Sequence, residues 1–222
     1  MRHLIHRPAP GGAPRRLGTA CFWTAGRFFV LTMALTLTGF AGQTRAADSL
    51  RSVQSFDAIV DPVERSRAIF LEVGKVIQSP RCMNCHPVGT RPTQGEGDHI
   101  RPHLPLITRG KDDRGAVALR CTSCHHNQNH EPSGVPGHAN WHMAPIEMGW
   151  QGRTLGQICV QIKDPARNGG MSLSRLHEHL ATDPLVGWGW HPGGNRTPAP
   201  GTQAQLGELV DAWIKTGARC PD

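Results

Sequence analysis

Two five-residue segments, Cys82-Met-Asn-Cys-His86 and Cys121-Thr-Ser-Cys-His125, constrain this 222-residue chain more than any other feature. Each reads C-x-x-C-H, the pattern at which a c-type haem is attached to a protein. Cysteines three positions apart lie one helical turn from each other, so both sulfurs can bond one porphyrin, and the histidine that follows can bind its iron. The segments therefore predict two haem c groups, held by Cys82, Cys85, Cys121 and Cys124, with His86 and His125 as proximal iron ligands.

Two other chemistries use paired cysteines. A redox-active dithiol is expected within a βαβ unit, and the flanking sequence contains no such pattern. Four cysteines in two pairs can also bind zinc, but a zinc site does not need a histidine directly after each pair. Covalent haem accounts for the full pattern, and the other two remain as alternatives.

The first 46 residues have the composition of an export signal. An apolar run from Phe28 to Ala41 follows five arginines, and no acidic residue occurs before Asp48. Small residues around Ala46 suit cleavage after it. The pair Arg15-Arg16 suggests a twin-arginine signal. We therefore expect a periplasmic protein whose mature part is residues 47–222, the alternative being a signal that is retained as a membrane anchor.

The positive charge of the chain belongs to this segment. The chain has 24 Lys and Arg against 17 Asp and Glu, a formal charge of +7. Six of the arginines and no acidic residue lie before residue 47, which leaves 18 basic against 17 acidic residues in the mature part. We therefore expect no nucleic-acid partner, and contact with a membrane only through a retained signal.

The mature part is predicted to be mainly α-helical with extensive irregular loops. Helices are expected to begin at Pro62 after Asp61, at Thr154, at Ser172 and at Thr202, where capping residues precede apolar stripes. Residues 116–120 are expected to begin a short helix that carries the second motif. Residues 87–114 are rich in Gly and Pro and predict a loop. The two motifs lie only 39 positions apart, so we expect a single dihaem cytochrome c domain over residues 47–222.

Few apolar side chains are available to bury. Only 5% of the residues are aromatic, whereas Gly and Pro number 26 and 18. Two porphyrins would supply the missing apolar surface, so this chain is expected to fold around them.

The remaining cysteines form an even number after export. Cys21 lies in the signal and four cysteines belong to the haem motifs, which leaves Cys159 and Cys220. In an oxidising compartment these two predict a disulfide. The alternative is that Cys159 binds an iron as a thiolate, as in some sulfur-oxidising cytochromes.

The ligand on the side of each iron opposite the proximal histidine decides the function. A second histidine gives a low-potential electron carrier, a methionine raises the potential, and an open face permits peroxide or small-ligand chemistry. The mature chain offers nine further histidines and four methionines, among which His103, His179, Met143 and Met148 lie in loops or flanks from which they can reach an iron. Four tryptophans are expected to form walls of the haem sites: Trp141, Trp150, Trp188 and Trp190.

Several longer phrases resemble a family of small exported dihaem cytochromes that are often labelled as an isoquinoline 1-oxidoreductase subunit. The resemblance runs from about residue 50 to the C-terminus. It rests on the first haem motif with Pro87 and on these phrases: Arg91-Pro-Thr-Gln-Gly95, Arg101-Pro-His103, Asn140-Trp141, Lys163-Asp-Pro-Ala-Arg-Asn-Gly169 and Val186-Gly-Trp-Gly-Trp-His-Pro-Gly193.

The resemblance implies an electron-transfer subunit that accepts electrons from a molybdenum-hydroxylase-type dehydrogenase on another polypeptide and passes them to the respiratory chain. The chain itself has no room for a molybdopterin domain. The resemblance also favours His103 and His179 as distal ligands, with Met148 next. The alternative is a dihaem enzyme, peroxidase-like or thiosulfate-oxidising, with an open or cysteine-ligated haem.

Overall fold

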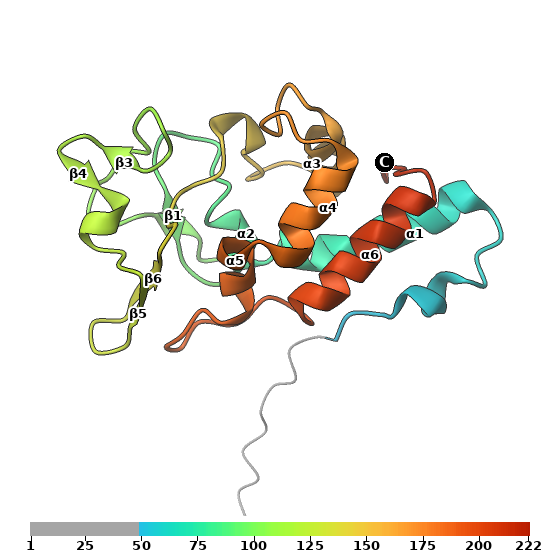
Figure 1. Cartoon of the computed structure of the whole chain (residues 1–222), viewed down its shortest axis with the longest axis horizontal. Coiled ribbons are helices and arrows are strands. Elements are labelled where there is room, and N and C mark those ends of the chain that lie inside the picture. The colour runs from blue at the N-terminus through green and yellow to red at the C-terminus, as the bar shows by residue number, and fades with distance from the viewer. Residues whose placement is uncertain (1–48) are drawn as a thin grey trace, which may run out of the picture. The chain divides into compact units, whose positions relative to one another are not determined.

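Four helices gather on one side of the molecule. In the computed structural model, which describes residues 49–222, these are α1 (Pro62–Ile77), α3 (Leu155–Lys163), α4 (Leu173–Thr182) and α6 (Gln203–Lys215) (Figure 1). The export signal predicted over residues 1–46 lies outside the described range. No helix between residues 49 and 222 has both the length and the apolar character needed to cross a bilayer.

Short elements connect and extend these helices. Three two-stranded antiparallel ribbons pair β1 with β2, β3 with β4 and β5 with β6. The fold is thus mainly helical with extensive loops, as predicted. The remaining elements are η1 (Val53–Phe56), α2 (Pro80–Met83), β1 (Thr93–Gln94), β2 (Arg101–Pro102), β3 (Gly115–Ala116), β4 (Leu119–Arg120), η2 (Cys121–Ser123), β5 (Gln128–His130), β6 (Val135–His138), η3 (Ile146–Met148), α5 (Pro184–Gly187) and η4 (Trp188–Trp190).

Capping residues set the helix boundaries where the sequence predicted them. The Asp61 carboxylate accepts hydrogen bonds from two backbone N–H groups in the first turn of α1. Thr154 and Thr202 form capping boxes at the starts of α3 and α6, and Ser172 caps α4. Gly217, with φ 101°, follows the end of α6. Each cap satisfies donors that the first helical turn leaves unpaired, which explains why these boundaries are readable from sequence.

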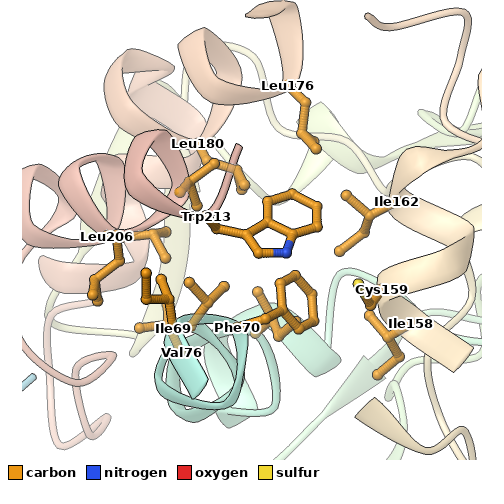
Figure 2. Close-up of a cluster of buried hydrophobic side chains, with 14 of the residues drawn as sticks. Ile69, Phe70, Val76, Ile158, Cys159, Ile162, Leu176, Leu180, Leu206 and Trp213 are labelled. Carbon is orange, nitrogen blue, oxygen red and sulfur yellow. The ribbon is translucent and has the colours of Figure 1, made fainter. Parts of the chain in front are cut away.

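Trp213 of α6 lies at the centre of the apolar core. Its ring is fully buried and lies 4.8 Å from the ring of Phe70 in α1, with side chains of α3 and α4 around it (Figure 2). The indole Nε1 donates to the carbonyl of Arg219 at 2.9 Å, so its one polar group is satisfied. Trp213 of α6 therefore packs between side chains of α1, α3 and α4, so the four helices share one core.

The predicted pairing of Cys159 and Cys220 is present. The two sulfurs lie 2.08 Å apart and the Cα atoms 5.6 Å apart. Cys159 is fully buried on the inner face of α3. A cysteine engaged in this way is not available as an iron thiolate, so the structure argues against the alternative in which Cys159 binds a haem.

Removing this disulfide is expected to lower the free energy of unfolding of the oxidised protein by about 2–4 kcal/mol, because the bond closes a loop across 61 residues. Cys159→Ala/Cys220→Ala and the wild type, each unfolded by urea with and without a thiol reductant, provide the measurement. The reductant should bring the wild type to the stability of the variant. A wild type whose stability does not respond to the reductant would contradict the expected contribution.

The apolar core stops at the two ends of one long segment, residues 84–143, which we call the loop segment. All members of the core cluster lie between Leu50 and Met83 or between Ala144 and Cys220. Inside the loop segment the buried apolar side chains are only Pro87, Ile107, Cys121 and Met143. A stretch of this length normally needs a core of its own to hold one conformation.

The helix expected over residues 116–120 is not formed. Gly115 and Ala116 instead pair with Arg120 and Leu119 in the β3–β4 hairpin, and Cys121 begins the short 3-10 turn η2. Gly115 has φ 94°, which is incompatible with a helix. Five residues are also too few to repay helix nucleation without packing against a core.

Candidate functional site

Each C-x-x-C-H motif folds as a single turn. The backbone N–H of His86 donates to the carbonyl of Cys82 at 3.2 Å, and that of His125 donates to Cys121 at 2.9 Å. The backbone of each motif thus forms the single turn that the spacing predicts.

A backbone carbonyl orients each motif histidine. Nδ1 of His86 lies 2.8 Å from the oxygen of Met148, and Nδ1 of His125 lies 2.7 Å from the oxygen of Pro136. A carbonyl oxygen only accepts, so Nδ1 carries the hydrogen in both rings. Nε2 of each neutral imidazole is then left with a free lone pair, which is the arrangement of a metal-binding histidine.

A tryptophan stacks on each motif histidine. The ring of Trp150 lies 3.4 Å from that of His86 at an angle of 8°, and Trp141 lies 4.6 Å from His125 at 9°. The indole fixes the plane of each imidazole, and the carbonyl bond fixes its rotation in that plane. Two parts of the chain without sequence similarity beyond the motif thus build the same local arrangement.

Burial keeps both histidines neutral. Desolvation lowers the pKa of His86 to about 3, opposed by the hydrogen bond to Met148. Burial also lowers the pKa of His125, again opposed by its carbonyl bond. A neutral imidazole is the form that binds a metal, and burial favours that form in both rings.

His103 faces His125. The two ring centres lie 5.9 Å apart with a tilt of 56°. Two imidazoles that bind one metal ion from opposite sides, each through a bond of about 2 Å, have ring centres roughly 6 Å apart. Nδ1 of His103 lies 3.1 Å from the carbonyl of Pro105, which leaves its Nε2 free as well. The two ring centres are thus at the spacing that a shared metal ion would need.

His179 of α4 belongs to the surroundings of His86. After desolvation and the Met148 carbonyl, the charge of His179 is the next influence on the His86 pKa, and it lowers that pKa. Nδ1 of His179 lies 3.3 Å from a carboxylate oxygen of Asp183, one turn along the chain. A carboxylate behind Nδ1 orients the ring and strengthens Nε2 as a ligand. His103 thus lies beside the histidine of the second motif, and His179 acts electrostatically on the histidine of the first.

Met148 lies behind His86. Its carbonyl accepts the His86 Nδ1–H, and its side chain is 4% exposed within the apolar core. The structure therefore gives Met148 a positioning role through its backbone, on the side of His86 away from Nε2, and argues against a distal sulfur ligand.

Met148→Leu is accordingly expected to leave both the absorption spectrum of the oxidised protein and its reduction potentials unchanged, because the substitution keeps the carbonyl and nearly the volume of the side chain. A potential that falls in this variant, with loss of an absorption feature of methionine-bound ferric haem, would reverse this assignment.

A cavity of about 480 Å³ lies beside the second motif. Its wall includes Cys121, Cys124 and His125, and also Cys85 from the first motif. The size lies in the range of pockets that hold small molecules and cofactors. Both motifs therefore border one space, and that space lies where the loop segment lacks a core.

Two of the four tryptophans expected around the haems line this cavity. Trp141 and Trp188 meet edge to face with ring centres 4.9 Å apart, and both contribute to the wall. Trp150 stacks on His86, whereas Trp190 packs against the core and donates from Nε1 to the carbonyl of Pro200.

The four motif thiols differ in exposure. Burial raises the pKa of Cys82 to about 12 and that of Cys85 to about 11, whereas the Cys124 side chain is exposed. Both motifs are thus partly enclosed: Cys82 and Cys85 are half-buried, whereas the second motif has one buried thiol, Cys121, and one exposed thiol, Cys124. Among residues 49–222, no group of three or more His, Cys, Asp or Glu side chains is placed to hold a metal ion together, so the zinc alternative lacks a ligand set there.

Sequence reasoning missed three arginines around the site. Arg109 is buried and its guanidinium donates to the carbonyls of Gly89 and Ala144 while pairing with Asp113, so it ties together the loops that flank both motifs. Arg81 and Arg196 line the cavity. Only Arg81 carried a signal, because it directly precedes Cys82.

Comparison with known proteins adds no relative. No family model, no curated protein and no solved structure matches the chain.

Proposed function

We propose that this chain is a periplasmic dihaem c-type cytochrome that carries electrons. Cys82 and Cys85 would hold one haem and Cys121 and Cys124 the other. His86 with His179, and His125 with His103, would bind the two irons. The observation that carries the proposal is the arrangement around the second motif. The ring centres of His125 and His103 lie 5.9 Å apart on the cavity wall, and a carbonyl holds Nδ1 of each ring, which leaves each Nε2 free.

The haem iron supplies a reversible one-electron change. The residues of this chain would hold the ligands of that iron in fixed orientations. Carbonyls of Met148, Pro136 and Pro105 fix three imidazoles by their Nδ1–H groups, and Trp150 and Trp141 fix two ring planes. Fixed ligands that do not rearrange between redox states favour rapid electron transfer, because little reorganisation accompanies the change of charge.

Two observations favour a carrier over the enzyme alternative. A second histidine near each motif would fill the face at which peroxide or another small ligand binds. Cys159, the candidate thiolate ligand of a sulfur-oxidising enzyme, is bonded to Cys220. The shared wall of the cavity supports exchange between the two haems, because Cys85 and Cys121 both border it.

The partners follow from the resemblance to the dihaem cytochrome family. A molybdenum-hydroxylase-type dehydrogenase on another polypeptide would deliver electrons, and a respiratory-chain acceptor would remove them. Cys124 is the one exposed thiol of the two motifs, so its side of the second motif would be the more accessible to a protein partner.

Carbon monoxide binding to the reduced protein tests the carrier against the enzyme. A carrier with four histidine ligands should give a low-spin reduced spectrum that carbon monoxide leaves unchanged for minutes. Rapid binding at one of the two haems would indicate an open face and favour the enzyme.

A further inference from the structure

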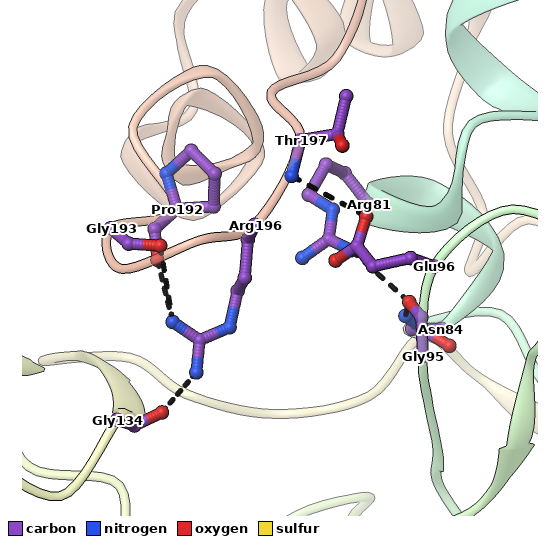
Figure 3. Close-up of polar contacts among 9 residues, drawn as sticks. All are labelled: Arg81, Asn84, Gly95, Glu96, Gly134, Pro192, Gly193, Arg196 and Thr197. Carbon is purple, nitrogen blue, oxygen red and sulfur yellow. Dashed lines mark hydrogen bonds and ion pairs between the residues drawn. The ribbon is translucent and has the colours of Figure 1, made fainter.

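The cavity beside the second motif carries a pair of arginines that no step above uses. Arg81 reaches it from α2 and Arg196 from the loop after η4 (Figure 3). Apart from histidines and cysteines, the only other ionisable group on the wall is Glu96. Two cations against one carboxylate leave the wall with one positive charge in excess.

Arg81 is held in place, but one of its hydrogen-bond donors has no partner. Its side chain is 4% exposed, and one Nη donates to the carbonyl of Gly95 and pairs with Glu96. Its Nε is buried without a hydrogen-bond partner. A buried guanidinium with an unused donor is costly unless a further acceptor comes to it.

Arg196 has no carboxylate within ion-pair distance among the residues that the structure describes. Its guanidinium donates to the carbonyls of Pro192, Gly193 and Gly134. Arg81 and Arg196 line the same cavity, and burial together with the positive charge of Arg81 lowers the pKa of Arg196, while Glu131 and Glu96 oppose this shift. Bringing like charges together on a cavity wall is unfavourable, and an anion in the cavity would offset this.

We propose that Arg81 and Arg196 form a carboxylate clamp that receives the propionate groups of the haem attached at Cys121 and Cys124. Guanidinium groups match carboxylates with two parallel hydrogen bonds, which suits two arginines and a ligand with two carboxylates. Arg81 also directly precedes Cys82, so the clamp connects the first motif to the cofactor of the second. This inference rests on the proposed function.

The test compares Arg196→Gln with the wild type, both exported and loaded with haem. Growth on 5-aminolevulinate that carries carbon-13 in its carboxyl group labels the propionate carboxyls, and infrared spectra between pH 5 and 8 then follow their ionisation apart from every protein carboxyl, Glu96 and Glu131 included. In the wild type the clamp keeps the propionates ionised throughout. In the variant, part of the labelled signal should become protonated at pH 5.

A redox titration supplies the second readout. Loss of a cation beside the haem disfavours the reduced state, so one of the two one-electron potentials should fall in Arg196→Gln and become pH-dependent, decreasing as the pH rises. Lys215→Gln is the control, because it removes a surface charge from α6, outside the cavity wall, where the side chain is 72% exposed. It should behave as the wild type does.

Each outcome decides the inference. Labelled carboxyls that titrate identically in Arg196→Gln and the wild type would overturn it, and so would a potential that falls equally at every pH, since that is the effect of a remote charge. If Arg196→Gln does not fold, Arg196→Lys carries the same test, because lysine lacks the paired donors. A purified protein without covalent haem would instead overturn the proposed function, so the two failures are distinguishable.

Discussion

Replacing His103 with alanine is expected to convert one haem from six- to five-coordinate while the other stays low-spin. His103 faces His125 at 5.9 Å, and its ring is held by the carbonyl of Pro105. Loss of the imidazole leaves an open iron face beside the cavity, so the reduced variant should bind carbon monoxide rapidly at half of its haem. Absorption spectra of the reduced protein with and without carbon monoxide give the measurement.

His179→Ala should produce the same change at the other haem, and the double variant should lose low-spin character at both. His99→Ala is the matched control, because this histidine is exposed and does not line the cavity. Spectra of His103→Ala and His179→Ala that both remain fully low-spin would contradict the assignment of these two residues and direct attention to His142, which also lines the cavity.

The second large effect concerns folding. Without covalent haem, the loop segment (residues 84–143) is expected to lose its ordered structure while the helical core persists. The core cluster and the Cys159–Cys220 bond lie outside that segment, and only four buried apolar residues lie inside it. The cofactors would therefore supply the apolar surface that orders it.

Hydrogen exchange on the exported variant with alanine at all four haem cysteines measures this. Amides of the loop segment should exchange at nearly unfolded rates, whereas amides of α1 and α6 should stay slower by roughly a thousandfold. A variant with alanine only at Cys121 and Cys124 keeps the first haem and should lose protection chiefly around β3–β6. Full protection of the loop segment in the four-alanine variant would show that it folds without haem.

Local chemistry explains which features could be read from the sequence. Asp61, Thr154, Ser172 and Thr202 cap helices through contacts within three residues, and the two C-x-x-C-H turns are equally local. These were predicted correctly. The pairing of Cys159 with Cys220 was predictable because only two cysteines remained for it.

The features that the sequence did not reveal depend on distant contacts. The His86 ring is oriented by the carbonyl of Met148, 62 residues away, and any residue type can supply a carbonyl. The sequence shows only the side chain of Met148, so it suggested the sulfur as a ligand and not the carbonyl as a hydrogen-bond acceptor. Arg196 joins the cavity wall only because its loop folds back to Gly134. The β3–β4 hairpin stands where a helix was predicted over residues 116–120, because Ala116 pairs with Leu119 across a turn that starts after Gly115.

The central claim is that this chain carries two covalently attached haems, and the intact mass of the protein purified from the periplasm tests it most directly. The account predicts the mass of the processed polypeptide plus two haems, with no free thiol after denaturation, because four cysteines hold haem and two form a disulfide. A mass equal to that of the polypeptide alone, with four thiols that react with an alkylating agent, would contradict it.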